Sequence, residues 1–334
     1  MGRAQEKSIR QQIPSDFRVR LLAWYDAHAR DLPWRKSRDP YRVWLSEIML
    51  QQTRVAAVIE HYHEFLRRFP TVQKLAAARE SSVLAAWSGL GYYRRARMLH
   101  AAAKVIAREL HGKFPHTAEG WRELPGVGRY TAAAIASIAF DEPVAVVDGN
   151  VERVLQRLEG RRLSGSRAWQ VAEGLLDRTR PGDFNQAMME LGATVCMPRA
   201  PTCLTCPIVE MCATRGELDG VAQPSRQKKR EIHYALNCRD SQVLLVRRPA
   251  RASLMPGMWE LPEIEAPVDH AKPTFTVKHS ITTTDYTVRV WNAAPINGTR
   301  GEWIPVSGLA RLPLTGLARK ILRRAGVFAI TLTA

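Results

Sequence analysis

Apolar residues recur at helical spacing through about the first two-thirds of the chain. Three series carry this pattern: Phe17, Leu21, Trp24 and Tyr25; Trp44, Ile48, Val55 and Ile59; and Leu99, Ala103, Ile106 and Leu110. Alanine, the strongest helix former, is concentrated at 76–78, 101–103 and 132–134. Glycine and proline interrupt the pattern at 89–91, 125–128 and 181–182. The pattern predicts an all-α region over residues 1–215.

The pattern changes near residue 216. Residues 216–231 are polar and end in a basic run, so we interpret them as a linker. Short β-rich runs follow at Val243–Val246 and Tyr286–Trp291, and a last helix is expected around Leu317–Ala325. The sequence therefore predicts a small α/β domain over residues 232–334.

Composition adds a charge argument to this two-part organisation. The 334 residues are 46% hydrophobic, which is enough for more than one core. Lys and Arg number 49 against 32 Asp and Glu, a net charge of +17. Such an excess favours a nucleic acid, because each neutralised phosphate releases condensed counterions. A general solubility effect is the alternative interpretation.

The sequence also indicates a compartment. No apolar run approaches the roughly 18 residues of a membrane span, and the first 20 residues are charged without a hydrophobic stretch. We therefore expect no signal peptide and no membrane partner, and place the protein in the bacterial cytoplasm, at the nucleoid when it is on DNA. In that reducing compartment, clustered cysteines indicate metal binding rather than disulfides.

Four of the five cysteines form a compact run with the spacing C-x6-C-x2-C-x5-C. Its members are Cys196, Cys203, Cys206 and Cys212. Zinc and a 4Fe-4S cluster both accept four thiolates. One compact run with a single x2 pair favours the cluster over zinc, which usually takes two separated short pairs. The fifth, Cys238, is expected to be a buried small apolar residue.

A glycine turn precedes a predicted helix in the middle of the chain. Residues 124–128 read Leu-Pro-Gly-Val-Gly, and the helical run 129–139 follows. The free N–H groups and dipole at such a helix start suit a phosphate, which makes Gly126 and Gly128 candidate DNA contacts. An ordinary junction between two helices is the other interpretation.

Two carboxylates have positions that suit chemistry. Asp148 and Asn150 come directly before a helix that begins near Val151, where both types are favoured caps. Glu47 lies inside the apolar segment 44–50. If it is buried, its pKa should rise, and it could act as a general acid. A place on the wet edge of an amphipathic helix is the alternative.

Together, these segments resemble the helix–hairpin–helix DNA glycosylases that carry an iron–sulfur cluster. Residues 44–55 (WLSEIMLQQTRV), 32–35 (LPWR), 89–93 (GLGYY) and 184–187 (FNQA) are similar to the adenine glycosylase branch, the MutY type. The resemblance covers about residues 15–215. It implies two helical modules that hold DNA across the cleft between them, a hairpin at about 120–140 and a 4Fe-4S loop at 196–212.

The resemblance implies roles for four catalytic residues. Glu47 would protonate the adenine ring, and Asp148 would stabilise or transiently bond the oxocarbenium-like sugar. Asn150 would hold the Asp148 region and the attacking water. Bifunctional relatives such as endonuclease III carry a Schiff-base lysine where this chain has Tyr130. A phenol forms no imine, so a monofunctional enzyme that leaves an abasic site is expected.

It also implies the residues that bind DNA. Those expected to line the pocket for the flipped adenine are Arg30, Trp34, Arg35 and Gln186. Gln52 and Tyr92 are expected to wedge into the base stack. Arg94, Arg95 and Arg97 lie beside Tyr92 in the sequence and would contact phosphates.

The last part of the chain resembles the Nudix-like domain of this branch. The resemblance rests on residues 254–262 (LMPGMWELP), whereas 271–276 carry none of the carboxylates of a hydrolase site. We therefore expect no nucleotide hydrolysis, and expect Ser280 and Thr282 to contact 8-oxoguanine. Residues 279–283 read His-Ser-Ile-Thr-Thr where the family often has His-x-Phe-Ser-His. That difference makes the lesion contacts the weakest part of the resemblance.

The sequence as a whole predicts a monomeric glycosylase of base excision repair. Its partner would be double-stranded DNA containing adenine opposite 8-oxoguanine or guanine. Two alternatives are weighed against it. An oxidised-pyrimidine glycosylase/lyase conflicts with Tyr130 and with the C-terminal domain. A non-catalytic iron–sulfur DNA-binding protein would not need Glu47 and Asp148, and both are present.

Overall fold

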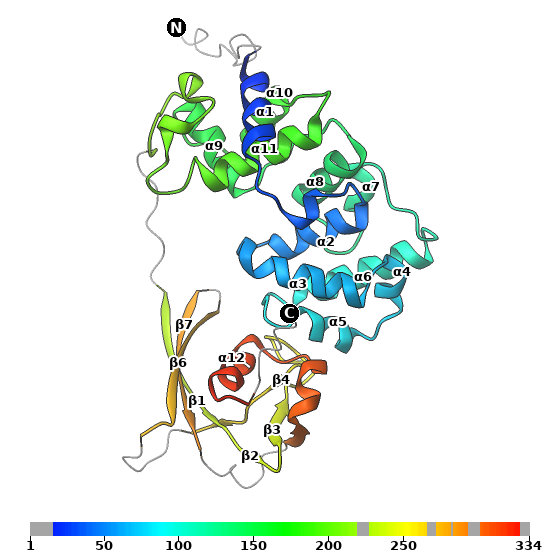
Figure 1. Cartoon of the computed structure of the whole chain (residues 1–334), viewed down its shortest axis with the longest axis vertical. Helices are drawn as coiled ribbons and strands as arrows, with labels where there is room; N and C mark the ends of the chain where they lie inside the picture. The colour runs from blue at the N-terminus through cyan, green and yellow to red at the C-terminus, as the bar shows by residue number, and fades with distance from the viewer. Residues whose placement is uncertain (1–15, 219–226, 266–271, 282, 293–300, 328–334) are drawn as a thin grey trace. The chain divides into compact units, whose positions relative to one another are not determined.

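A computed structural model of the chain describes residues 16–218, 227–265, 272–281, 283–292 and 301–327 (Figure 1). The contacts divide it into two compact units. The first unit joins Met1–Gln52 to Val105–Ala222, and the second joins Thr53–Lys104 to Gln223–Ala334. The contacts thus group helices from the first half of the chain with the C-terminal region.

The first unit is helical. Between residues 16 and 218, the described part of the chain contains no strand, as predicted. Its elements are α1 (Asp16–His28), η2 (Pro33–Arg35), α2 (Pro40–Leu50), α7 (Ala118–Arg122), α8 (Arg129–Phe140), α9 (Gly149–Glu159), α10 (Gly165–Leu175), α11 (Pro181–Thr194), η3 (Cys203–Thr205) and η4 (Val209–Met211). Side-chain caps begin several of them: the carboxylates of Asp39 and Asp148 and the hydroxyl of Ser164 each accept a backbone N–H of the first turn.

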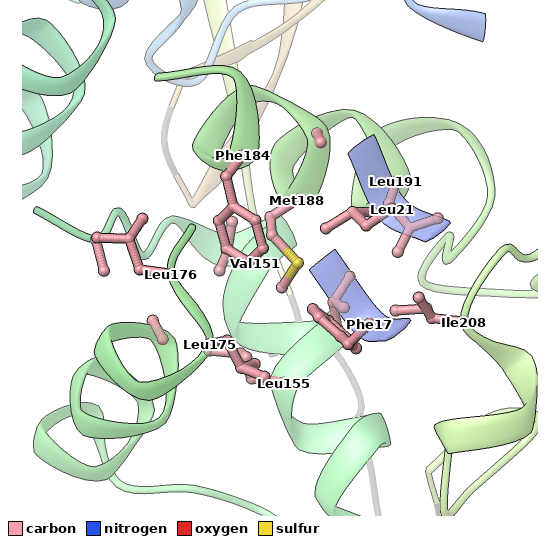
Figure 2. Close-up of a cluster of buried hydrophobic side chains, with 14 of the residues drawn as sticks. Phe17, Leu21, Val151, Leu155, Leu175, Leu176, Phe184, Met188, Leu191 and Ile208 are labelled. Atoms are coloured by element: carbon pink, nitrogen blue, oxygen red, sulfur yellow. The ribbon is translucent and has the colours of Figure 1, made fainter. Parts of the chain in front are cut away.

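The core of this unit forms where α1, α9, α10 and α11 meet. Phe17 and Leu21 from α1 lie against Phe184, Met188 and Leu191 from α11, all buried (Figure 2). The side chains of α11 at 184, 187, 188 and 191 follow the helical period, so one stripe of the helix faces this core. Gln186 and Glu190, the polar side chains of α11 that are relevant to the site, lie outside this cluster.

The second unit combines helices with two small sheets. The helices from the first half of the chain are α3 (Val55–Arg68), α4 (Val72–Ala77), α5 (Glu80–Trp87) and most of α6 (Arg94–Arg108). The predicted apolar series from Trp44 to Ile59 therefore spans two helices, α2 and α3. The break covers residues 51–54, where Gln52 has a positive φ of 56°.

One sheet has mixed pairing and the other is antiparallel. One has the order β5-β1-β7-β6, in which β1 and β7 are parallel and the other pairs antiparallel; in the other, β3 pairs with β2, β4 and β8. The strands are β1 (Lys228–Ala235), β2 (Cys238–Arg239), β3 (Gln242–Arg247), β4 (Trp259–Glu260), β5 (Glu263–Ile264), β6 (Phe275–Ile281), β7 (Thr284–Trp291) and β8 (Glu302–Pro305). The helix α12 (Gly316–Arg324) contributes its apolar side to the core of this unit, where Leu317 and Ile321 are buried together with Leu245 of β3 and Val288 of β7.

The strands at 242–247 and 284–291 and the helix at 316–324 confirm the predicted ones. Residues 228–231, which we assigned to the linker, lie instead in β1, because they pair with β7 from Lys228 onward. The expectation for Cys238 was wrong: it lies in the two-residue strand β2 and is exposed. None of the helices in the described ranges is long and apolar enough to cross a membrane.

We predict that Gly192→Ala destabilises the first unit. A Cβ at Gly192 would lie 2.6 Å from Asn150 Cβ and 2.9 Å from Asn150 O, so the backbone of α9 would have to move. Overpacking of this kind costs about 1–3 kcal/mol. Urea unfolding measures the loss. Gly174→Ala is the control, because Gly174 lies in α10 with nothing within 4 Å of its added Cβ; it should be neutral or slightly stabilising. Equal effects at the two positions would contradict the packing argument.

Candidate active site

Glu47 lies in the interior of the first unit. It belongs to α2, whose start is fixed by Pro40 and by the Asp39 carboxylate, which accepts from Arg42 N. Apolar neighbours bury this helix on most sides, and Glu47 itself is only 5% exposed. The interpretation that Glu47 lies on the wet edge of an amphipathic helix is therefore wrong.

The partner of Glu47 is Tyr130, from the first turn of α8. The Tyr130 hydroxyl donates to Glu47 Oε2 at 2.6 Å and lies 3.5 Å from Met189 Sδ of α11. Three helices thus meet at this carboxyl group. Burial, followed by the neighbouring charges of Glu47 and Asp148, raises the pKa of Tyr130 well above its usual value, so the phenol keeps its proton.

Burial also controls the protonation of Glu47. It raises the pKa of Glu47 to about 7, and the nearby charge of Asp148 adds to the rise. The hydrogen bond from Tyr130 and the charge of Arg35 act in the opposite direction. A large fraction of Glu47 therefore holds its proton at neutral pH, as a general acid requires.

Asp148 is the N-cap of α9. Its Oδ1 accepts from Asn150 N at 2.9 Å and from Val151 N at 2.7 Å, and its Oδ2 accepts from Asn150 Nδ2 at 3.1 Å. Asp148 is therefore a helix cap, as one interpretation of the sequence predicted. The same capping bonds hold its carboxylate within electrostatic range of Glu47, which is compatible with the catalytic interpretation. Two backbone N–H groups at the start of α9 thus surround this carboxylate, whereas apolar side chains surround Glu47. Two neighbouring carboxyl groups with such different surroundings are suited to separate acid and anion roles.

Asn150 is itself held by Arg153, which the sequence analysis did not identify. Arg153 donates to Asn150 Oδ1 at 2.8 Å, to Gly192 O at 2.7 Å and to Cys196 O at 2.8 Å. The support of Asp148 therefore extends through α9 to the end of α11 and the first cysteine. An arginine in a helix between Glu152 and Val154 gives no sequence signal for such a role.

Arg30 and Arg35, expected in the adenine pocket, both bind Glu190. Arg30 donates to the two carboxylate oxygens at 2.6 and 2.8 Å, and Arg35 donates to Oε2 at 2.8 Å. Glu190 is buried on α11. It was missed, although an acid in the apolar run 187–191 (AMMEL) is the same kind of signal that identified Glu47.

The other two expected pocket residues lie on the same elements. Trp34 is buried in η2 beside Arg35, and Gln186 is half-buried on α11, one turn before Glu190. Their side chains therefore come from the two elements that the Glu190 ion pairs connect. Their part in binding a base stays a prediction.

The glycine turn joins α7 to α8 as expected. Gly126 has a φ of +75°, which favours glycine, and Gly128 is the N-cap of α8. Val127 between them is buried, while both glycines are exposed. An added Cβ at Gly128 would meet nothing within 4 Å, so the protein itself does not crowd this position. The start of α8 is thus open to an external group such as a phosphate.

The expected wedge residues both have a left-handed backbone. Gln52 has a φ of 56° and Tyr92 a φ of 48°, a conformation that costs a non-glycine residue about 1–3 kcal/mol. They belong to different units, Gln52 to the first and Tyr92 to the second. Tyr92 is 45% exposed. Strain and exposure together at these positions fit residues kept for contact with another molecule.

Arg95 and Arg97 differ from their expected role. The Arg95 guanidinium lies over the rings of Trp87 and Tyr92, at 5.4 Å from each centroid, and donates to Leu90 O and Gly91 O. Arg97 donates to Pro256 O at 2.7 Å. Both side chains therefore bind the protein itself instead of extending toward a phosphate.

The expected lesion contacts are only partly described. Ser280 lies on β6, and its hydroxyl donates to Asp285 Oδ1 at 2.6 Å across the hairpin. Thr282 lies outside the described residues. Burial, and then the charge of Lys320, lower the pKa of the adjacent His279.

The four clustered cysteines follow α11. Each is half-buried. The buried Arg157 brings its guanidinium to 3.2 Å from Cys196 Sγ, and Arg215 N donates to Cys212 Sγ at 3.4 Å. Burial raises the pKa of Cys206 to about 11, and the other three thiols add to the rise, so all four lie within electrostatic range. Within the described ranges, no group of three or more His, Cys, Asp and Glu side chains has metal-binding geometry.

Comparison with known proteins first defines the class. Residues 45–172 match the HhH-GPD superfamily of base excision DNA repair proteins. Among solved structures, a thermostable thymine-DNA glycosylase aligns with a TM-score of 0.56 and 30% identity, over 60% of this chain and 94% of that one. The helical part of the chain thus has the fold of this class of repair proteins, which confirms that part of the predicted fold.

Curated relatives then define the family. An adenine DNA glycosylase of Schizosaccharomyces pombe is 34% identical over 75% of this chain and 69% of its own length. The mouse adenine DNA glycosylase is 48% identical over 69% of this chain and 48% of its own length. The chain spans 48–60% of the mouse, rat and human relatives. It belongs to the adenine DNA glycosylase family, as its motifs predicted.

The site predicts a pH dependence with a definite sign. If protonated Glu47 is the acid, base excision should fall about tenfold per pH unit above about 7. The Tyr130 bond lowers the pKa of Glu47, so Tyr130→Phe should move this limb to higher pH. Single-turnover excision measured from pH 5 to 9 gives both curves. A flat profile, or a limb that moves to lower pH in Tyr130→Phe, would contradict the assignment.

Proposed function

We propose that this protein is a monofunctional adenine DNA glycosylase that removes adenine paired with 8-oxoguanine or guanine and leaves an abasic site. The observation that carries the proposal is the pair of unlike carboxyl groups. Glu47 is buried with a pKa near neutrality, and Asp148 is held by backbone N–H groups. Membership of the adenine DNA glycosylase family supports the choice of base.

The proposed mechanism assigns one step to each group. The Glu47 carboxyl donates its proton to the adenine ring, and the N-glycosidic bond breaks with its electron pair leaving on neutral adenine. The Asp148 carboxylate stabilises the cationic sugar, and water adds to the anomeric carbon and loses a proton to solvent. Asn150, tied to Asp148 and Arg153, positions this carboxylate. Tyr130 offers no amine, so the strand is left intact.

Substrate binding is proposed for residues around and beyond these carboxyl groups. Arg30, Trp34, Arg35 and Gln186 line the adenine pocket, with Glu190 fixing the two arginines. Gly126 and Gly128 bind a phosphate at the start of α8. Gln52 and Tyr92 enter the base stack. A Nudix-like C-terminal domain without a hydrolase site reads 8-oxoguanine, through Ser280 and Thr282. The working form is a cytoplasmic monomer.

The cysteine loop is proposed to hold a 4Fe-4S cluster through Cys196, Cys203, Cys206 and Cys212. The donor set fits, because a cubane takes four thiolates and the buried Arg157 cation lies beside Cys196 Sγ. The bound cluster would supply a rigid covalent link between the four sulfurs. Arg157 also donates to Met197 O and Pro198 O, and so holds the loop from the side of α9.

Base excision on defined duplexes tests the proposal. The substrates carry adenine opposite 8-oxoguanine, adenine opposite guanine, or thymine opposite guanine. The wild-type protein should give strand cleavage at adenine only after alkali, and Glu47→Gln should lose at least about a hundredfold in rate while still binding the duplex. Glu60→Gln, which changes a glutamate outside the site, is the control. Cleavage without alkali would favour a lyase, and excision of thymine alone would refute the choice of base.

The cluster proposal predicts a metal content. The purified protein should be brown and contain about four iron atoms per chain. Cys203→Ser should lose much of the iron and of the DNA affinity. Cys238→Ser is the matched control, because Cys238 lies outside the run and is exposed. Iron and zinc analysis together with visible absorption decides between a 4Fe-4S cluster and a zinc site. A colourless, zinc-containing, active protein would exclude the cluster.

A further inference from the structure

Residues 88–93, here called the wedge loop, connect α5 to α6 within the second unit. Gly89, Gly91 and Tyr92 in this loop all have positive φ. Its ends are buried, with Ser88 1% and Tyr93 5% exposed, whereas Tyr92 is exposed. The loop thus presents one aromatic ring from a fixed base.

The base of the wedge loop is bound by the C-terminal part of the chain. Ser88 Oγ donates to Leu314 O at 2.8 Å, and Tyr93 OH donates to the same oxygen at 3.1 Å. Arg319 NH1 donates to Ser88 O at 2.7 Å. One carbonyl and one guanidinium, more than 220 residues away in sequence, therefore hold both ends of the loop.

These anchors are themselves firmly placed. Leu314 is fully buried and forms a bridge with Trp259 beside β4. Thr315 follows it and caps α12 through Ala318 N, and Arg319 lies one turn further along that helix. A displacement of α12 or of the β4 edge would therefore be transmitted to the wedge loop.

The loop has little freedom to relax away from this contact. Gly89 has a φ of +114°, and a Cβ there would lie 3.0 Å from His61 Nε2 and 3.5 Å from Arg319 NH1. On the inner side, Arg95 lies over the Tyr92 ring and donates to Leu90 O and Gly91 O. Arg95 thus contacts the Tyr92 ring itself, and Arg319 and Leu314 bind the two ends of the wedge loop that carries it.

We infer that Arg319 is a positioning residue for Tyr92: through Ser88 it holds the wedge loop in the form in which Tyr92 enters the base stack. The inference rests on the proposed function, which gives Tyr92 its place in the duplex. It assigns the C-terminal region a second task beyond reading the opposite base. Changes in that region should then alter insertion of Tyr92 even on DNA that contains no oxidised guanine.

A double-mutant cycle between Arg319 and Tyr92 tests the inference. Arg319→Met removes the guanidinium that donates to Ser88 O and keeps a side chain of similar length, while His61 Nε2, 3.2 Å from the same oxygen, stays in place. A hydrogen bond from a charged group supports an expected loss of about tenfold in single-turnover excision. In a Tyr92→Ala background, the same change should cost less than about twofold, because the ring to be positioned is gone. Arg319→Lys, which keeps a charged donor, should restore most of the rate.

A binding assay supplies a second readout that does not depend on excision. The duplex carries 2-aminopurine beside the mismatched adenine, and its fluorescence rises when a wedge unstacks it. Arg319→Met should reduce this rise as Tyr92→Ala does. Arg324→Met is the charge-matched control, because Arg324 lies exposed on α12 over the Phe275 ring. It should leave the fluorescence rise unchanged.

Three results would overturn the inference. The first is an equal loss of excision rate from Arg319→Met in the wild-type and Tyr92→Ala backgrounds. The second is a reduction of the fluorescence rise by Arg324→Met as large as that by Arg319→Met. The third is a full fluorescence rise in Arg319→Met. If Arg319→Met does not fold, Arg319→Gln replaces it in the same cycle, since it removes the guanidinium that binds Ser88 O and keeps a polar side chain. A wild-type protein that excises no adenine would refute the proposed function, and the fluorescence assay would still decide the inference.

Discussion

A carboxyl group taken out of water must either lose its charge or acquire partners that replace the water. Glu47 meets the first condition. The apolar neighbours of α2 exclude water from it, one phenol binds it, and its pKa rises to about 7. The other features of the first unit follow from this placement: Tyr130 must come from the start of α8 to reach it, and Asp148 must be stabilised separately, since its charge raises the pKa of Glu47 further.

Glu190 meets the second condition in the same unit. Burial alone would raise its pKa, but the hydrogen bonds and charges of Arg30 and Arg35 outweigh burial and lower the pKa to about 2. Arg35 also acts on Glu47, where its charge lowers the pKa. Arg35 therefore contacts one buried acid and acts electrostatically on the other. The two buried acids thus have pKa values shifted in opposite directions, because Glu190 has two arginine partners at hydrogen-bond distance and Glu47 has a phenol.

The sequence allowed the prediction of features that depend on neighbours in the chain. Helical periodicity, the glycine turn and the cap at Asp148 are local, and the acid in an apolar segment identified Glu47. Features that depend on distant partners were missed. Glu190 has the same local signal as Glu47, but its partner Arg30 is 160 residues away. Arg95 follows Tyr92 in sequence and looked like a phosphate ligand, yet its side chain folds back under the loop. The start of β1 was assigned to the linker because its pairing with β7 is equally non-local.

The support of Asp148 connects the cysteine loop to the candidate active site. Asp148 receives a bond from Asn150, Asn150 is held by Arg153, and Arg153 also binds the backbone oxygens of Gly192 and Cys196. A guanidinium has donors in a fixed fork, so a shift of one acceptor changes its bonds to the others. Whatever fixes the sulfur of Cys196 therefore also fixes the carbonyl oxygen that Arg153 needs. The loop can thus contribute to the placement of the carboxylate without any electron transfer.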